Sequence, residues 1–286
     1  MTVPEPAPDP GDEIDLTLPN PARVYDFMLG GAHNFATDRE FAEKLLAVLP
    51  DTREVALANR AFLGRAVRAC LDRGVRQFLD LGSGIPTAAP VHEIAHRADP
   101  AARVAYVDVE AVSVAMSRRI LAGVDGTSIT AADLTDVDAV LTAPGVADLL
   151  DPAEPVAVLA VSVLHFVRDD ELLGTLFDRY ATAFGPGSML VVSHGSTDVD
   201  DPAAAERMRT IERFTQDSAQ PARARDRAQL RHLLVDRTGH RLELLEPGLV
   251  DVSAWRPEDG RPPVGPAGMY AVVGEVVPRR GDGQSR

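Results

Sequence analysis

Two acidic residues, each at or near the end of a short apolar run, could hold a ligand. Asp80 lies within residues 78–87, where Gly82 and Gly84 follow the apolar run. Asp108 ends the next apolar run, residues 104–108. Glycine has no Cβ and adopts positive φ, so a turn of this kind lets a ligand approach the backbone closely. A carboxylate placed like Asp108 can accept both hydroxyls of a ribose.

The charge of Asp80 and the spacing of the glycines separate two classes of ligand. A dinucleotide site has a third glycine and holds a pyrophosphate at a helix N-terminus, but the corresponding position here is Thr87. Asp80 would repel a pyrophosphate and attract a positive charge. A ribose combined with a positive charge indicates S-adenosylmethionine. A nicotinamide dehydrogenase and an ordinary strand-to-helix turn without a ligand stay open as alternatives.

Composition limits the classes of function. The chain has 286 residues, 45% hydrophobic and 25% charged, which suits one large globular domain. Its formal net charge of −14 argues against a nucleic-acid partner, because tight binding needs clustered Lys and Arg. The single cysteine, Cys70, allows no disulfide within the chain. We find no signal peptide and no apolar run of membrane-spanning length, so we expect a cytoplasmic protein without a membrane partner.

Apolar runs alternate with helical patterns, which predicts an α/β fold. Continuous apolar runs suit parallel strands that helices cover on both faces. We therefore expect a Rossmann-like, mostly parallel sheet of seven strands. The strands are predicted at residues 76–81, 103–108, 127–131, 156–163, 188–193, 242–245 and 270–277. The helices between the first five strands are predicted at residues 86–97, 112–122, 137–150 and 170–184.

The segments around this pattern predict the domain organisation. Residues 1–19 and 278–286 are expected to be flexible tails. Residues 20–75 are expected to form three helices that act as a lid over the strand ends, the second opening with a capping box at Thr37 and Glu40. Residues 76–277 form the main domain, with a helical insertion at 198–232 near an acceptor pocket.

Ligands of open α/β sheets bind at the carboxyl ends of the strands, which selects a small set of candidate residues. His165, after the fourth strand, is a candidate general base or orienting group, and equally a structural histidine. Methyl transfer can proceed mainly by positioning, so a base is optional. Asp133 can bind an adenine amino group or serve as a helix cap or turn residue. The candidate binding residues after the four strands are Gly82, Ser83, Gly84, Asp108, Val109, Asp133, Leu134 and Ser162.

The helical N-terminal segment supplies further candidates. Tyr25, Gly31 and Asn34 flank a Gly-Gly break and are expected to close over the ligand. A cation for the carboxylate of the ligand is expected from Arg23, Arg39 or Arg60, with Arg60 in the binding set. Trp255 either walls the acceptor pocket or covers the sheet edge.

One short motif points to a different chemistry. His92, Glu93 and His96 match His-Glu-x-x-His, in which two histidines on one helix face bind zinc. The motif follows the glycine turn directly, where a helix flanking the sheet accounts for it. No third ligand follows at a familiar spacing, so we predict no metal site.

Several longer stretches resemble a known family. They are residues 21–40, 58–63, 77–87, 163–166, 246–250 and 255–257. Together they are similar to an actinobacterial family of S-adenosylmethionine-dependent methyltransferases, long catalogued as a domain of unknown function, over about residues 20–277. The resemblance implies a class I methyltransferase fold with S-adenosylmethionine as cofactor. By position, it implies that Asp80, Gly82 and Gly84 form the first donor-binding motif and that Asp108 binds the ribose.

The sequence therefore predicts a methyltransferase that acts on a small organic molecule by in-line displacement. Apolar residues near the predicted lid and insertion, including Phe27, Met28, Met208 and Phe214, favour an organic acceptor over a polymer. An S-adenosylmethionine-binding protein with a regulatory or non-methylating role is the alternative. The acceptor, the atom methylated and the oligomeric state, a homo-oligomer included, stay open.

Overall fold

A mostly parallel sheet forms the centre of the computed structural model, which describes residues 18–198, 201–216, 220–238, 241–258 and 267–278. Seven strands run in the order β3-β2-β1-β4-β5-β8-β6, and β7 pairs with β8 off this path. The first five strands are parallel, whereas β8 is antiparallel to β5. The strands are β1 (Gln77–Leu81), β2 (Arg103–Asp108), β3 (Thr127–Ala131), β4 (Val156–Val161), β5 (Met189–Gly195), β6 (Leu242–Leu244), β7 (Val250–Asp251) and β8 (Met269–Val276).

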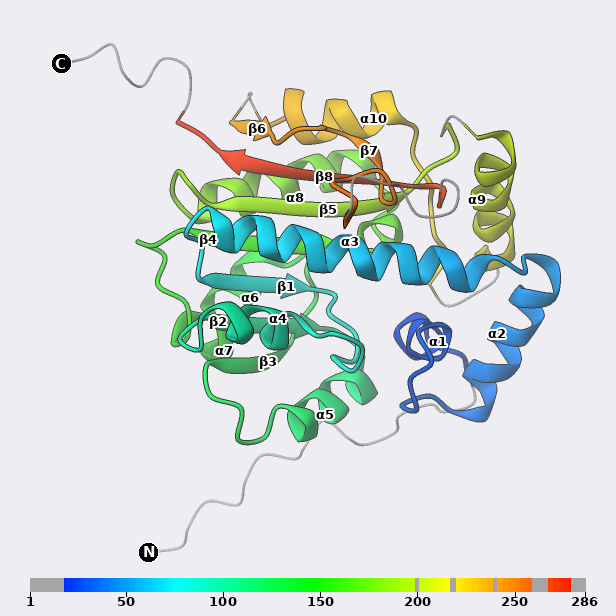
Figure 1. Ribbon diagram of the computed structural model, residues 1–286, viewed down its shortest axis with the longest axis horizontal. Coiled ribbons are helices and arrows are strands. Elements are labelled where there is room, and N and C mark those ends of the chain that lie inside the picture. Colours follow the sequence, from blue (N-terminus) through cyan, green and yellow to red (C-terminus); the bar gives the residue numbers. More distant parts are fainter. Residues whose placement is uncertain (1–17, 199–200, 217–219, 239–240, 259–266, 279–286) are drawn as a thin grey trace, which may run out of the picture.

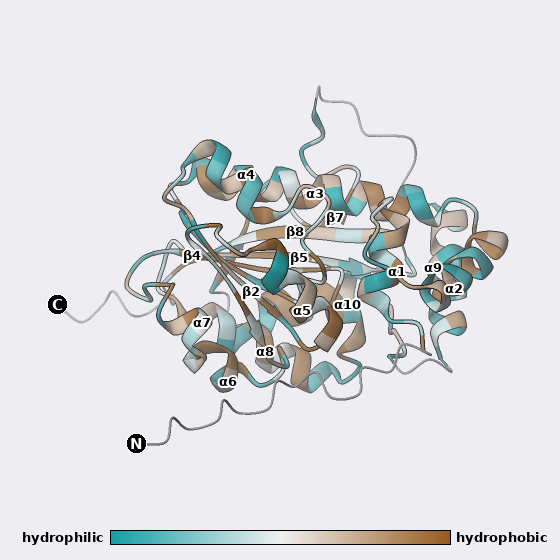
Figure 2. Cartoon of the chain, turned by 90° about the horizontal axis from the view of Figure 1, so that it is seen from below, coloured by the Kyte–Doolittle hydropathy of each residue, from teal (hydrophilic) through white to brown (hydrophobic). Residues whose placement is uncertain are grey.

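Helices cover both faces of the sheet (Figure 2). The side chains of a strand alternate between its faces, so Phe78 joins one buried cluster while Leu79 and Leu81 join another. The first cluster includes α3 and α4, and the second includes α6, α7, α8 and α10. The helices are α1 (Pro21–Met28), α2 (Ala36–Val48), α3 (Thr52–Asp72), α4 (Val91–Ala98), α5 (Ala111–Ile120), α6 (Val137–Thr142), α7 (Pro144–Ala147), α8 (Asp170–Ala183), α9 (Pro202–Thr215) and α10 (Arg227–Arg231).

This architecture confirms the predicted Rossmann-like class I fold with a seven-stranded path. The chain order reverses beside β1, because β2 and β3 extend the sheet on one side and β4 and β5 on the other. Ligands of open α/β sheets bind at such a switch point. In Figure 1 the carboxyl end of β1 points toward α1 and α2, with α9 beside them.

Several predicted boundaries are wrong in instructive ways. The helix after the glycine turn begins at Val91, not at residue 86, because Pro86 and Pro90 keep the preceding loop extended. The helix predicted at 137–150 is two helices, broken before Pro144, which has no N–H to donate. The short strand β7 was not predicted. The segment 198–232 contains α9 and α10, but residues 199–200 and 217–219 lie outside the described residues, as do 1–17 of the first tail and 279–286 of the second.

The predicted capping box at Thr37 and Glu40 is also wrong. The helix α2 begins at Ala36 with Phe35, not Thr37, as its N-cap, and the Asp38 carboxylate accepts the Phe35 N–H at 2.9 Å. The same carboxylate accepts the Arg23 Nε–H and the Asn20 N–H, each at 2.9 Å. Asp38 is completely buried, so it joins the start of α1 to the start of α2.

The helices α1 and α2 form a separate apolar cluster with Ala56, near the start of α3. Phe41 of α2 meets Phe214 of α9 edge to face, with ring centroids 5.1 Å apart. This cluster therefore extends from the N-terminal helices to the helix that follows β5. Among the described residues, no helix is both long and apolar enough to cross a membrane.

Candidate functional site

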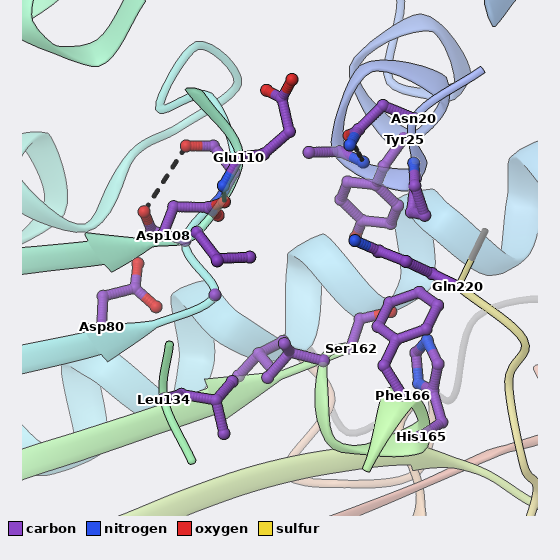
Figure 3. Close-up of a pocket in the computed structure, with 18 of the residues that line it drawn as sticks. Asn20, Tyr25, Asp80, Asp108, Glu110, Leu134, Ser162, His165, Phe166 and Gln220 are labelled. Carbon is purple, nitrogen blue, oxygen red and sulfur yellow. Dashed lines mark hydrogen bonds between the residues drawn. The ribbon is translucent and has the colours of Figure 1, made fainter. Parts of the chain in front are cut away.

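A cavity of about 660 Å³ lies at the carboxyl ends of β1, β2 and β4. Such a volume falls within the range of small-molecule sites. Asp80, Asp108 and Leu134 lie on one side of the cavity, and Tyr25, Phe166 and Gln220 lie on the other (Figure 3). The predicted residues that line it are Tyr25, Arg60, Asp80, Gly82, Ser83, Gly84, Asp108, Val109, Asp133, Leu134, Ser162 and His165. Gly31 and Asn34 are not part of the wall.

The glycine turn after β1 has the geometry that a close-fitting ligand needs. Gly82 and Gly84 have φ of 61° and 60°, a region that side chains with a Cβ rarely adopt. A Cβ on Gly82 would overlap the side chain of Val163. The Gly84 N–H donates to Asp108 Oδ2 at 2.7 Å, which ties the turn to the end of β2. The turn is therefore held open as a cradle by backbone conformation and one buried carboxylate.

Two buried carboxylates face this cradle. Burial raises the pKa of Asp80 to about 7, although the Arg60 guanidinium opposes the shift and Asp108 adds to it. Burial also raises the pKa of Asp108, while hydrogen bonds from the N–H groups of Glu110 and Gly84 oppose that shift. A positive ligand in the cavity would favour the ionised form of both groups. The pair therefore suits a cationic nucleoside better than a pyrophosphate.

Only one of the three candidate arginines reaches the cavity. The Arg60 side chain lines it and donates from Nε to the Ala88 carbonyl, in the loop after the glycine turn. Arg39 is exposed and donates to Asn34. Arg23 is buried between Asp38 and Glu110, with N–O distances of 2.9 and 3.1 Å. Arg23 thus connects α1 to the start of α5, and Arg60 is the candidate for an anionic ligand group.

Asp26 is a site residue that the sequence analysis missed. It is buried, it lines the cavity, and its Oδ2 accepts the His33 N–H and the Asn34 Nδ2–H at 2.8 and 2.9 Å. Its Oδ1 accepts the Thr87 hydroxyl at 2.8 Å. A Cβ on Gly31 would overlap this carboxylate. Gly31 and Asn34 therefore position Asp26 against the loop of the glycine turn, although they do not line the cavity.

A chain of polar side chains connects α1 to the end of β4. The Asn59 Nδ2 group donates to the Tyr25 hydroxyl at 3.0 Å, and Asn59 Oδ1 accepts the Ser193 hydroxyl at 2.6 Å. Ser193 Oγ in turn accepts the Ser162 N–H at 2.9 Å. Ser162 has φ of 60°, the left-handed region in which a serine is strained. No local pattern predicts the hydrogen bonds of Asn59, and its position within the family-like stretch 58–63 is the one signal that could have pointed to it.

His165 lies in the one-turn helix Leu164–Phe166, directly after β4. Burial lowers its pKa to about 4, and the Arg225 guanidinium contributes. Its Nδ1 is buried and has no partner among the described residues. The neighbouring His194 packs edge to face against it and accepts a hydrogen bond from Arg225 on Nε2 at 3.0 Å. His165 is therefore a neutral imidazole at neutral pH, and its ring lines the cavity.

Asp133 and Leu134 follow β3 and line the cavity from the adjoining strand end. Asp133 is exposed, and its Oδ1 accepts both the N–H and the hydroxyl of Thr135 at 2.8 Å. Asp133 therefore makes the hydrogen bonds of a turn residue, Asp136 is the N-cap of α6, and the adenine contact of Asp133 stays a prediction. Leu134 presents its side chain to the cavity while its carbonyl accepts the Tyr180 hydroxyl at 2.8 Å.

The two histidines of the zinc motif bond to protein groups, and the tryptophan belongs to the core. His92 Nδ1 bonds the Tyr106 hydroxyl at 2.8 Å, and His96 Nε2 bonds the Ala102 carbonyl at 3.0 Å. Within the described parts of the chain, no cluster of three metal-ligating side chains occurs. Trp255 is fully buried and packs edge to face on Phe62 of α3. It covers the sheet and lines neither this cavity nor the apolar one beside it.

The fold is that of a class I methyltransferase, and the cavity lies at its switch point. The family model described as S-adenosyl methyltransferase matches residues 8–277. The chain therefore belongs to this family. The match confirms the predicted family and the predicted cofactor, S-adenosylmethionine.

Two crystal structures share the fold over nearly the whole chain. One is a candidate methyltransferase from Thermobifida fusca YX, 32% identical, with a TM-score of 0.83 over 92% of this chain and 97% of that chain. The other is a DUF574 family protein from Streptomyces avermitilis MA-4680, 30% identical, with a TM-score of 0.82 over 93% of this chain and 100% of that one. A comparison with curated proteins gives no significant match.

Proposed function

We propose that this protein transfers the methyl group of S-adenosylmethionine to a small organic acceptor. One observation carries the proposal: a glycine cradle flanked by two buried carboxylates adjoins a second, mainly apolar cavity, and the two cavities share Tyr25, Ser162 and His165 in their walls. The first cavity suits the donor, and the second suits an apolar acceptor next to it.

In the first cavity, different residues contact different groups of the donor. S-adenosylmethionine supplies a methyl carbon made electrophilic by its sulfonium. Asp108 sits at the end of β2 and accepts the ribose hydroxyls. Asp80 offsets the positive charge of the donor, and Arg60 pairs with its carboxylate. Val109, which is 62% exposed, and Leu134 give an adenine ring two apolar surfaces.

His165 contributes position more than proton transfer. An imidazole with a pKa of about 4 is a weak base at neutral pH. As a neutral acceptor, it orients a hydroxyl or amine of the incoming molecule. Holding acceptor and donor in line supplies most of the acceleration in a displacement of this kind. His165 is proposed here as the residue that contacts the acceptor.

The remaining predictions concern the domain organisation, the cellular location and the partners of the protein. We propose that residues 20–75 act as a lid on the main domain, 76–277, because α1 and α3 both contribute to the cavity wall. The cytoplasmic location and the absence of a nucleic-acid partner stay predictions from the sequence, and the oligomeric state stays open.

Calorimetry with S-adenosylmethionine, and with a nicotinamide dinucleotide for comparison, tests the first step. We expect heat and thermal stabilisation from the former alone. The second step is to incubate the protein with pooled organic acceptors and to measure S-adenosylhomocysteine release. Donor binding without release from any pool would favour the alternative, a donor-binding protein that does not methylate. If neither S-adenosylmethionine nor the nicotinamide dinucleotide binds at millimolar concentration, the proposal is contradicted.

A further inference from the structure

A second cavity of about 230 Å³ adjoins the donor cavity. It lies among α1, α2, α3 and α9 and borders the apolar cluster of the N-terminal helices. Phe166 and Gln220 line both cavities, as do Tyr25, Ser162 and His165. Figure 3 shows Phe166, His165 and Gln220 together on the side of the donor cavity away from Asp80 and Asp108. A molecule in the second cavity would therefore lie beside the end of the donor cavity that these residues form.

The wall of this second cavity is apolar. Met28, Phe41, Leu45, Val55, Met208 and Ile211 all contribute to it. An engineered apolar cavity of about 150 Å³ binds benzene, so a volume of about 230 Å³ suits one or two fused rings. A flexible polar chain would lose much of its hydration against these side chains.

The charges in the wall discriminate against anions. Among the described residues that line this cavity, there is no Lys or Arg, and Glu212 is the only one with a formal charge, since His165 is neutral. Glu206, on the same helix, pairs with Arg209 and Arg213. The Glu212 carboxylate has no ion pair or hydrogen-bond partner among the described residues. An acceptor with a carboxylate or phosphate would face an unpaired negative charge and no cation.

Building on the proposed function, we propose that this cavity binds the methyl acceptor and selects compact, mainly apolar molecules of one or two rings without a negative charge. The hydroxyl or amine to be methylated lies at the shared wall, beside the neutral imidazole of His165. The apolar body of the acceptor occupies the space between α1 and α9.

The charge selection is tested with three probes that share one ring system. We would titrate the full-length protein, saturated with S-adenosylhomocysteine, with 1-naphthol, 1-naphthylmethylamine and 1-naphthoate in a calorimeter. The neutral probe and the cationic probe are expected to bind about tenfold or more tightly than the anion, because the anion loses hydration without a partner. Binding of 1-naphthoate as tight as that of 1-naphthol would overturn the proposal.

Two pairs of variants locate the binding. Ile211→Trp fills the cavity from α9 and is expected to weaken 1-naphthol binding about tenfold or more, while Leu57→Trp, on an exposed site of α3, leaves it unchanged. Glu212→Gln is expected to improve 1-naphthoate binding about threefold, and Glu206→Gln, outside the wall, is expected to leave it unchanged. Undiminished 1-naphthol binding by Ile211→Trp would place the probe elsewhere and refute the assignment.

Titration with S-adenosylmethionine distinguishes a failure of the acceptor assignment from a failure of the proposed function. Each variant is also titrated with S-adenosylmethionine, whose affinity should stay within about twofold of the parent, which shows that the variant is folded. If the parent protein binds no S-adenosylmethionine, the proposed function fails. If it binds S-adenosylmethionine but does not bind 1-naphthol, only the acceptor assignment fails.

Discussion

The two cavities of this protein are held in shape by different forces. The donor cavity is fixed by backbone: left-handed glycines, and N–H groups that donate to Asp108. The apolar cavity is formed by side chains of helices, with α2 and α9 meeting through an aromatic pair. Backbone geometry tolerates little change, whereas a side-chain surface can be altered one residue at a time. We therefore expect the cavity at the strand ends to tolerate fewer substitutions than the apolar cavity.

The apolar region depends on one buried ion pair, whose loss is expected to have the largest effect. Asp38→Ala leaves Arg23 buried without its main partner, and removing one member of a buried pair costs about 3–5 kcal/mol. We expect a loss of this size in the free energy of unfolding by urea denaturation. Glu40→Ala is the matched control on the same helix, with an expected change of about 0.5 kcal/mol or less. Equal losses in the free energy of unfolding for the two variants would instead support the capping box that the sequence predicted at Thr37 and Glu40.

A substitution at Gly82 is expected to have the next largest effect, a loss of donor affinity. Gly82→Val introduces a side chain at positive φ that overlaps Val163, so S-adenosylmethionine affinity should fall by about a hundredfold or more in calorimetry. Gly187→Ala is the control, because it has φ of 88° with only ordinary contact for a Cβ and lies outside the cavity. That control should lose stability and keep donor affinity. Near-normal affinity of Gly82→Val would show that the donor does not touch this turn.

The next prediction concerns Asp108, the carboxylate at the end of β2 that binds the ribose in the proposed function. Asp108→Ala removes a charged acceptor and should weaken donor binding by about 1–3 kcal/mol. Asp133→Ala serves as comparison, since the Asp133 carboxylate is exposed and already accepts two hydrogen bonds from Thr135. We expect its effect on donor affinity to be about threefold or less. The reverse order of the two effects would mean that the donor is held at the end of β3 and not at the end of β2.

The sequence predicted the donor region much better than the apolar region. The strands and the glycine turn follow from local patterns, so Asp80, Gly82 and Asp108 were placed correctly beside one another. The bonds of Asp38 and Asp26 could not be predicted, because they join segments whose approach depends on how whole helices pack. Asn59 and Ser193 are 134 positions apart and meet only in the folded chain. Local pattern thus identifies strand ends, whereas tertiary packing decides which helix residues face them.

The smallest expected effect concerns the proton on Asp80. Its pKa is raised from 3.8 to about 7, so the folded state holds a proton that the unfolded state releases between these values. Stability contributed by this group therefore falls as pH rises from about 4 to 7.

Donor binding should change in the opposite direction, because a cationic ligand favours the carboxylate. The ionised fraction is about one tenth at pH 6 and nine tenths at pH 8, so calorimetry should show affinity rising about ninefold across this range. Asp80→Asn should remove the rise; a slope that survives in this variant would assign the titration to another group.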